Sequence, residues 1–203
     1  MFIDKTYGLV MSDDETRHGA RLKKGLYKEF LEEVMLLSIY SNWKFPMNNV
    51  LCKPIIGYQG YDAVITSLLT DFKKYEEYVE ITFPHDGRKE NEFNRQVNAK
   101  GFHGKFYDAS SQRKEASDRI IAKAQQKAIK DYEYPNSTLL IGLDLFPSFN
   151  PNKPKHCADI SNLVEKLKQF NYKVGAVYLI LLNAQNMPAQ DRILPIVCNE
   201  ARK

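Results

Sequence analysis

The chain is poor in cysteine: among 203 residues, Cys52, Cys157 and Cys198 lie far apart and in no metal-ligand spacing. This pattern excludes a disulfide scaffold and a Cys/His zinc module, and it predicts free thiols in a reducing compartment. Long apolar runs are also missing, because the longest, residues 174–182, is too short to span a bilayer. We therefore expect no membrane segment and no membrane partner.

The sequence also lacks the motifs that mark several enzyme classes. It has no glycine-rich phosphate loop and no Gly-x-Ser-x-Gly nucleophile elbow, so neither a P-loop NTPase nor an α/β-hydrolase is supported. Its first residues do not follow the basic-then-apolar order of a secretory signal, so we expect a cytoplasmic protein. The formal net charge of +4 is mild, and it permits a nucleic-acid partner without requiring one.

What the chain does contain is typical of one globular domain. Hydrophobic residues make up 43% and aromatic residues 12% of the 203 residues, enough for a buried core. We find no internal repeat and no linker, so we expect a single domain over residues 1–203, with a core over about 16–182. The segment 183–203, which contains two prolines, is expected to form an irregular C-terminal tail.

Hydrophobic periodicity predicts the order of the elements. Apolar residues at helical spacing indicate helices over 16–40, 115–132 and 158–170. Runs typical of strands occur at 50–54, 61–65, 78–83, 138–143 and 174–182, with a short edge strand at 193–197. The polar segment 85–114 fits a long surface loop. This order predicts an α/β fold in which helices cover both faces of a mixed β-sheet.

Two of these strands each carry one acid. If 61–65 and 78–83 form a hairpin centred near Asp71, Asp62 lies opposite Glu80. Two carboxylates at that distance repel each other and raise one pKa, unless a cation lies between them. The pair therefore suggests a divalent metal, Mg²⁺ or Mn²⁺, held by carboxylates and water. The alternative is an acid pair at a solvent-exposed sheet edge.

The first helix offers further acids. Glu33 lies within its apolar stripe and Glu29 at the margin of that stripe. A charged side chain in a buried stripe is costly unless it has a partner, so Glu33 is either part of a site or a salt-bridged, snorkelling residue. On the second helix, Lys123 and Lys127 are four residues apart and share one face beside the apolar stripe.

The polar segment 85–114 is rich in basic residues and contains four aromatic ones. Cations contact phosphates and aromatic rings stack on bases, so the segment suits nucleic acid, although a solvated loop has the same composition. The candidate nucleic-acid-binding residues are Arg88, Lys89, Arg95, Lys100, Lys105 and Arg113.

Residues 22–143 resemble the PD-(D/E)XK, or restriction-endonuclease-like, nuclease superfamily. The resemblance is carried by Asp62 in Gly-Tyr-Asp-Ala and by the tripeptide Glu80-Ile81-Thr82, placed between a helix with acids and a helix with lysines. It implies an α-β-β-β-α-β core and a Mg²⁺ or Mn²⁺ bound by Asp62, Glu80 and the Ile81 carbonyl. Glu33 or Glu29 would complete the ligand shell.

The sequence departs from the superfamily at Thr82, which stands where the motif has lysine. Some members are thought to recover that charge from the following helix, which points to Lys127, with Lys123 behind it. The resemblance then implies hydrolysis of phosphodiester bonds in nucleic acid, DNA ahead of RNA, by a protein that can act as a homodimer. Two alternatives stay open: an inactive nuclease-fold module for binding or assembly, and an α/β protein unrelated to nucleases that binds a small molecule.

Overall fold

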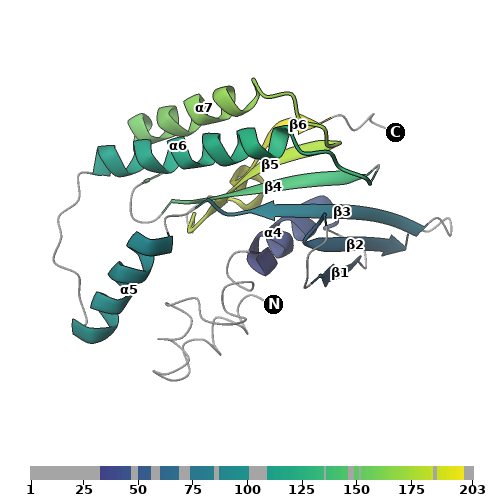
Figure 1. Cartoon of the computed structure of the whole chain (residues 1–203), viewed down its shortest axis with the longest axis horizontal. Coiled ribbons are helices and arrows are strands. Elements are labelled where there is room, and N and C mark those ends of the chain that lie inside the picture. Colours follow the sequence, from purple (N-terminus) through teal and green to yellow (C-terminus); the bar gives the residue numbers. More distant parts are fainter. Residues whose placement is uncertain are drawn as a thin grey trace.

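Helices cover both faces of one six-stranded sheet in the computed structural model (Figure 1). The structure describes residues 33–46, 50–55, 60–68, 74–84, 87–100, 109–134, 136–145, 149–150, 152–184 and 187–198. The strands are β1 Val50–Pro54, β2 Ala63–Leu68, β3 Lys74–Thr82, β4 Ser137–Asp144, β5 Ala176–Leu182 and β6 Ile193–Cys198. The helices are α4 Met35–Lys44, α5 Gly87–Lys100, α6 Ala109–Ala128 and α7 Pro154–Leu167, with a 3₁₀ turn, η2, at Ala189–Arg192.

The strands lie in the sheet in the order of the sequence, from β1 to β6. The first three form an antiparallel meander, β3, β4 and β5 are parallel, and β6 is antiparallel to β5. The expected α/β class and mixed sheet are confirmed, and so is the edge strand near 193–197. Parallel neighbours need crossovers, which α6 and α7 supply on one face while α4 covers the other (Figure 1).

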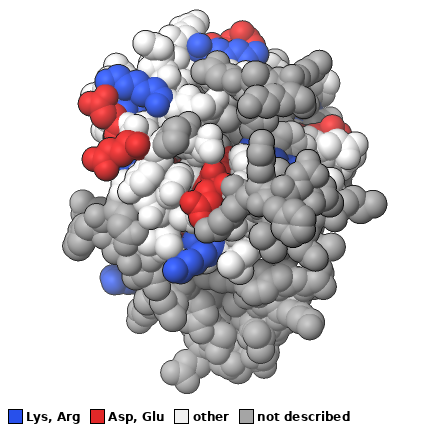
Figure 2. Space-filling view, turned by 90° about the vertical axis from the view of Figure 1, so that its right-hand side faces the viewer, with Lys and Arg blue, Asp and Glu red and all other residues white. Residues whose placement is uncertain are grey.

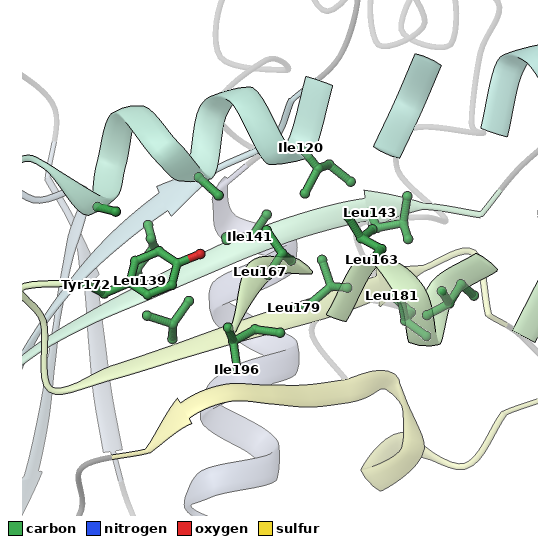
Figure 3. Packing of buried hydrophobic residues seen from close by; sticks show 14 of the residues in the cluster. Ile120, Leu139, Ile141, Leu143, Leu163, Leu167, Tyr172, Leu179, Leu181 and Ile196 are labelled. Atoms are coloured by element: carbon green, nitrogen blue, oxygen red, sulfur yellow. The ribbon is translucent and has the colours of Figure 1, made fainter. Parts of the chain in front are cut away.

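Strands β4 and β5 are buried along almost their whole length because helices cover them on both sides. One hydrophobic cluster lies beneath α6 and α7, where Ile120, Leu163 and Leu167 point at Leu139, Ile141 and Leu179 (Figure 3). A second cluster lies on the α4 side and includes Leu36, Leu37, Val79 and Leu140. In β3, Val79 and Ile81 belong to the cluster on the α4 side, and no β3 residue belongs to the cluster beneath α6 and α7. The face of β3 toward α6 is therefore available for polar side chains.

Gly142 in β4 brings α4 close to the sheet. A Cβ at this position would overlap the Phe83 ring and come within 2.9 Å of the Leu36 side chain. The absence of a side chain therefore lets α4 and the end of β3 pack directly on the β4 backbone.

The helix boundaries differ from the prediction: α6 ends at Ala128 instead of 132, α7 is Pro154–Leu167 instead of 158–170, and two further differences are larger. The expected loop 85–114 instead contains α5 and the first turns of α6. Arg, Lys, Glu and Gln are good helix formers, and a helix that does not face the core needs no apolar stripe, so periodicity missed it. The first helix continues to Lys44 instead of ending at residue 40, while the expected part 16–32 lies outside the described residues.

The remaining expectations concern thiols and membranes. All three cysteines are free thiols, as the sequence predicts. Among the described segments, none of the helices combines the length and the apolar character that crossing a bilayer requires.

Candidate functional site

Asp62 lies just before β2, close enough to Glu80 of β3 that the charge of Glu80 raises its pKa. The register of β2 with β3 pairs Ala63 with Val79, as predicted, and the amide of Asp62, just before β2, also donates to the Val79 carbonyl at 2.9 Å. The Asp62 side chain is held as well, since its Oδ2 accepts a 2.6 Å hydrogen bond from the Ile81 amide. Backbone contacts thus orient this carboxylate on rigid sheet structure.

Glu80 is a buried carboxylate, only 5% exposed. Its Oε1 accepts hydrogen bonds from two lysines, one in the last turn of α6 (Lys127 Nζ, 2.5 Å) and one just after that helix (Lys130 Nζ, 2.6 Å). Burial alone would raise the pKa of Glu80, but the hydrogen bonds from Lys127 and Lys130, together with the nearby Tyr132 hydroxyl, outweigh it, so the net shift is downward. Glu80 is therefore ionised at neutral pH.

Lys130 joins three parts of this site. Besides Glu80, its Nζ donates to the Gly60 carbonyl at 3.2 Å and lies 5.2 Å from the centre of the Tyr132 ring. The segment before β2, the strand β3 and the loop after α6 are thereby connected through one ammonium group. We call Asp62, Glu80, Lys127 and Lys130 the carboxylate–lysine centre.

The pKa values within the centre move in different directions. Burial raises the pKa of Asp62, and the neighbouring Glu80 charge raises it further, while the Ile81 amide and the two lysines partly offset this. Burial and the Glu80 charge also raise the pKa of Tyr132, so its hydroxyl stays protonated. Acids with separated pKa values in one place are typical of functional sites, although ion-pair networks produce them too.

One atom of the centre has no partner. Glu80 Oε2 is buried and accepts no hydrogen bond from the described residues. Leaving a charged acceptor buried and unpaired costs about 1–3 kcal/mol or more, so such atoms call for a ligand, an ion or water. Oε2 is therefore the position where an added cation would be stabilised most.

A divalent metal fits this donor set as a water-rich site. Glu80 Oε2 and the Asp62 carboxylate are hard oxygen donors, and Mg²⁺ usually keeps several waters when it binds through one or two carboxylates. The described residues contain no group of three or more His, Cys, Asp or Glu side chains placed to hold a metal. A closed, all-protein cage is therefore not formed by this part of the chain.

The other predicted site residues differ in how close they lie to the carboxylate–lysine centre. Thr82 is buried two residues after Glu80 in β3, so it lies on the same face of the sheet. Lys123 lies one turn before Lys127 and is exposed. Glu33 is half-buried at the start of the helical segment that covers the opposite face, so the structure does not place it beside Glu80; Glu29 lies outside the described residues.

The predicted nucleic-acid-binding residues do not gather at the centre. Arg88, Lys89, Arg95 and Lys100 belong to α5, near the N-terminal end of α6 and away from the end that carries Lys127 (Figure 1); Arg95 and Lys100 are exposed, and Lys105 lies outside the described residues. On the side of the molecule drawn in Figure 2, described Lys and Arg side chains lie beside Asp and Glu side chains and form no single basic patch.

Arg113 differs most from its expected role. It was predicted to contact nucleic acid from a loop, but it lies in α6, is 6% exposed and pairs with Asp159 of α7 at 2.9 Å. Its guanidinium therefore joins two helices at the edge of a cleft of about 260 Å³ between them. A buried, ion-paired arginine of this kind stabilises packing and is not a free phosphate contact.

Sequence reasoning missed two features of the molecule. Lys130 lies just after α6, three residues beyond Lys127, and both lysines reach Glu80. The second feature is Glu77, which is 1% exposed on the α4 side and accepts from Tyr40, Lys44, Tyr75 and Thr138. Both Glu77 oxygens have partners, so Glu77 serves as an anchor for α4, whereas Glu80 keeps one oxygen open.

The fold and the centre together define an α/β protein with an acid pair and two lysines on the sheet face beneath α6. The chain has no match among known protein families, curated proteins or solved structures. Its function is therefore inferred from the geometry of the centre.

Proposed function

We propose that the chain is a metal-dependent nuclease of the restriction-endonuclease-like type, which hydrolyses phosphodiester bonds of nucleic acid, DNA in preference to RNA. The observation that carries the proposal is the contact of Lys127 Nζ with Glu80 Oε1 at 2.5 Å, near enough to Asp62 that both charges affect its pKa. A helix lysine in contact with the acid pair is what the resemblance requires once Thr82 has replaced the motif lysine. The antiparallel meander, the helix α6 and the parallel strand β4 also follow the order that the superfamily implies.

In this proposal Asp62 and Glu80 Oε2 hold Mg²⁺ or Mn²⁺. The metal would supply an activated water and offset charge on the scissile phosphate. Lys127 is placed to donate to a phosphate oxygen, because Glu80 is the one partner of its Nζ among the described residues and its side chain is 21% exposed. Lys130 holds Glu80 in position through its second bond to Gly60.

The charges of the centre support this division of roles. Two carboxylates and two ammonium groups cancel, so the positive charge of a bound divalent ion would remain available for the phosphodiester. Electrostatic stabilisation of this kind is commonly worth a factor of about 100 to 1,000 in rate.

Cleavage of single-stranded and plasmid DNA in Mg²⁺ or Mn²⁺ tests the proposal. We expect Asp62→Asn and Glu80→Gln to lower the rate roughly 100-fold or more. The matched controls are Glu165→Gln and Lys168→Ala, because these residues form a 2.8 Å ion pair on the exposed side of α7 and its end. Wild-type rates in Asp62→Asn would overturn the assignment.

A second function, that of a nuclease-fold module without catalysis, is favoured by one observation. Glu80 Oε1 is already saturated by two lysines, and the described residues supply no third acid. Such a module would bind nucleic acid or protein without needing Asp62. Calorimetry decides between the two: stoichiometric Mn²⁺ uptake that is lost in Glu80→Gln supports the nuclease, and no uptake by wild type supports the module.

A further inference from the structure

Three tyrosines pack against one another beside the carboxylate–lysine centre. The rings of Tyr78 and Tyr134 are stacked, with centroids 4.2 Å apart and planes 22° apart. Tyr61 meets both rings edge-on, at 5.0 Å from Tyr78 and 4.9 Å from Tyr134. We call these three residues the tyrosine triad.

The triad is built from the same segments as the centre. Tyr61 directly precedes Asp62, and Tyr134 follows Lys130 by four residues. Tyr78 shares a face of β3 with Glu80, because side chains two residues apart point to the same side of a strand. Two residues along a strand span roughly 6.6 Å, which is within the reach of one nucleotide from its phosphate to its base.

The rings are not part of the hydrophobic core. All three are half-buried, and none of them belongs to either of the two core clusters of the described residues. Their mutual packing therefore forms an aromatic surface that meets solvent at the border of the charged centre. Aromatic side chains with a polar tip are suited to such positions, since one end is apolar and the other is wet.

We propose that the tyrosine triad stacks on an unpaired nucleobase, so that the substrate is single-stranded nucleic acid or a single-stranded end. The choice of a nucleobase follows from the neighbouring Lys127, whose ammonium group is placed to contact the phosphate of the same nucleotide. Bases within a duplex are already stacked on both faces and cannot reach the rings. The phosphate contact rests on the proposed function, whereas stacking requires no cleavage.

Fluorescence anisotropy of labelled oligonucleotides tests the assignment without chemistry. The full-length protein is titrated in EDTA, at one fixed salt concentration, with a single strand, an abasic single strand of equal length and a duplex. We expect wild type to prefer the single strand over both competitors by roughly tenfold, because each stacked base contributes in that range. The abasic strand keeps every phosphate and removes only the stacking partner.

Two substitutions at one position separate stacking from folding. Tyr134→Leu removes the ring and is expected to weaken single-strand binding roughly tenfold while leaving abasic-strand and duplex binding unchanged. Tyr134→Phe keeps the ring and is expected to bind like wild type. If Tyr134→Leu unfolds, as a melting curve would show, Tyr61→Leu with Tyr61→Phe replaces the pair.

The outcomes also distinguish this inference from the nuclease proposal. Equal binding of single strand and abasic strand by wild type, no binding of any probe, or a Tyr134→Leu variant that binds like Tyr134→Phe would each overturn the triad assignment. Preferential single-strand binding with no Mg²⁺- or Mn²⁺-dependent cleavage would keep the triad and reject the nuclease. Cleavage that ignores both Tyr134 variants would keep the nuclease and reject the triad.

Discussion

Lys127 and Glu80 are 47 positions apart in the sequence, yet Lys127 Nζ lies 2.5 Å from Glu80 Oε1. The contact exists because α6 crosses back over the sheet between β3 and the parallel strand β4. The crossover helix thus places Lys127 next to β3, the strand whose Glu80-Ile81-Thr82 tripeptide has threonine instead of lysine at its third position.

The two lysines on Glu80 are expected to differ in their effect on catalysis. Lys127→Met should lower the cleavage rate roughly 100-fold, because its ammonium group is the one placed to reach a phosphate. Lys130→Met should lower the cleavage rate about tenfold. Glu80 would keep its bond from Lys127 but lose the connection to the Gly60 carbonyl that Lys130 provides. Steady-state cleavage assays give both values. If the exposed Lys123→Met variant lost as much cleavage rate as Lys127→Met, the assignment of the phosphate contact to Lys127 would be contradicted.

Asp62 is expected to be a destabilising residue at neutral pH. Burial raises its pKa above the ordinary 3.8, so the folded chain binds the proton more tightly than the unfolded chain does. The protonated Asp62 carboxyl therefore adds to the free energy of unfolding below the unfolded pKa. This stabilisation is lost as pH rises through the folded pKa, which leaves a buried charge at pH 7. Asp62→Asn should therefore raise the melting temperature at pH 7 while abolishing cleavage. A lower melting temperature in this variant would contradict the assigned pKa direction.

Glu80 should show the opposite dependence on pH. Burial acts to raise its pKa, but the bonds from Lys127 and Lys130 and the nearby Tyr132 hydroxyl lower it below the ordinary 4.5. Its stabilising contribution is present above pH 4.5 and is lost as pH falls through the folded pKa. Urea denaturation between pH 7 and pH 3 should thus show a flatter acid limb in Glu80→Gln than in wild type. Parallel curves would mean that Glu80 is not ion-paired in solution.

Glu77 provides a structural counterpart to Glu80 on the other face of β3. Glu77→Gln removes the charge that pairs with Lys44 at 3.2 Å, and breaking a buried pair of this kind costs about 3–5 kcal/mol. We expect that loss in urea denaturation, with cleavage per folded molecule unchanged. A variant of normal stability, or one that is stable and inactive, would contradict the anchor role.

Gly142 is expected to tolerate no side chain. Gly142→Ala places a methyl group against the Phe83 ring and Leu36, and overpacking of this kind costs about 1–3 kcal/mol. Gly60→Ala is the control, because a Cβ there meets nothing within 4 Å and should change stability by no more than about 0.5 kcal/mol. Equal denaturation midpoints for the two variants would show that α4 does not pack as closely on β4.

Local patterns in the sequence predicted the sheet but not the partners of its buried charges. The alternation of Val79 and Ile81 with Glu80 fixed the face and the register of β3, and the apolar run of β4 indicated cover on both sides. β3 begins at Lys74, four residues before the expected start at 78, because the polar Glu76 and Glu77 add no apolar signal to this part of the strand. Glu77 is tolerated in the strand only through Tyr40 and Lys44, which are more than thirty residues away in the sequence.

The residues of the carboxylate–lysine centre were only partly predictable, because local spacing does not encode contacts between distant segments. Asp62, Glu80 and Lys127 were assigned from spacing and resemblance, and the structure brings them together. The contact of Lys130 with Gly60 depends on how the loop after α6 returns to β4, which no local pattern encodes. The helix α5 lacked an apolar stripe and was predicted as a loop, and its basic residues lie away from the end of α6 that carries Lys127 (Figure 1).

The central claim is that Asp62 and Glu80 share a divalent cation beside Lys127. A crystal structure with Mn²⁺, read from its anomalous difference density, tests this most directly. The account predicts one peak at about 2.1 Å from Glu80 Oε2 and from an Asp62 oxygen, with Lys127 still within reach. Density without such a peak, with both lysines unchanged on Glu80 at saturating Mn²⁺, would contradict the nuclease and leave a charge-neutral structural centre.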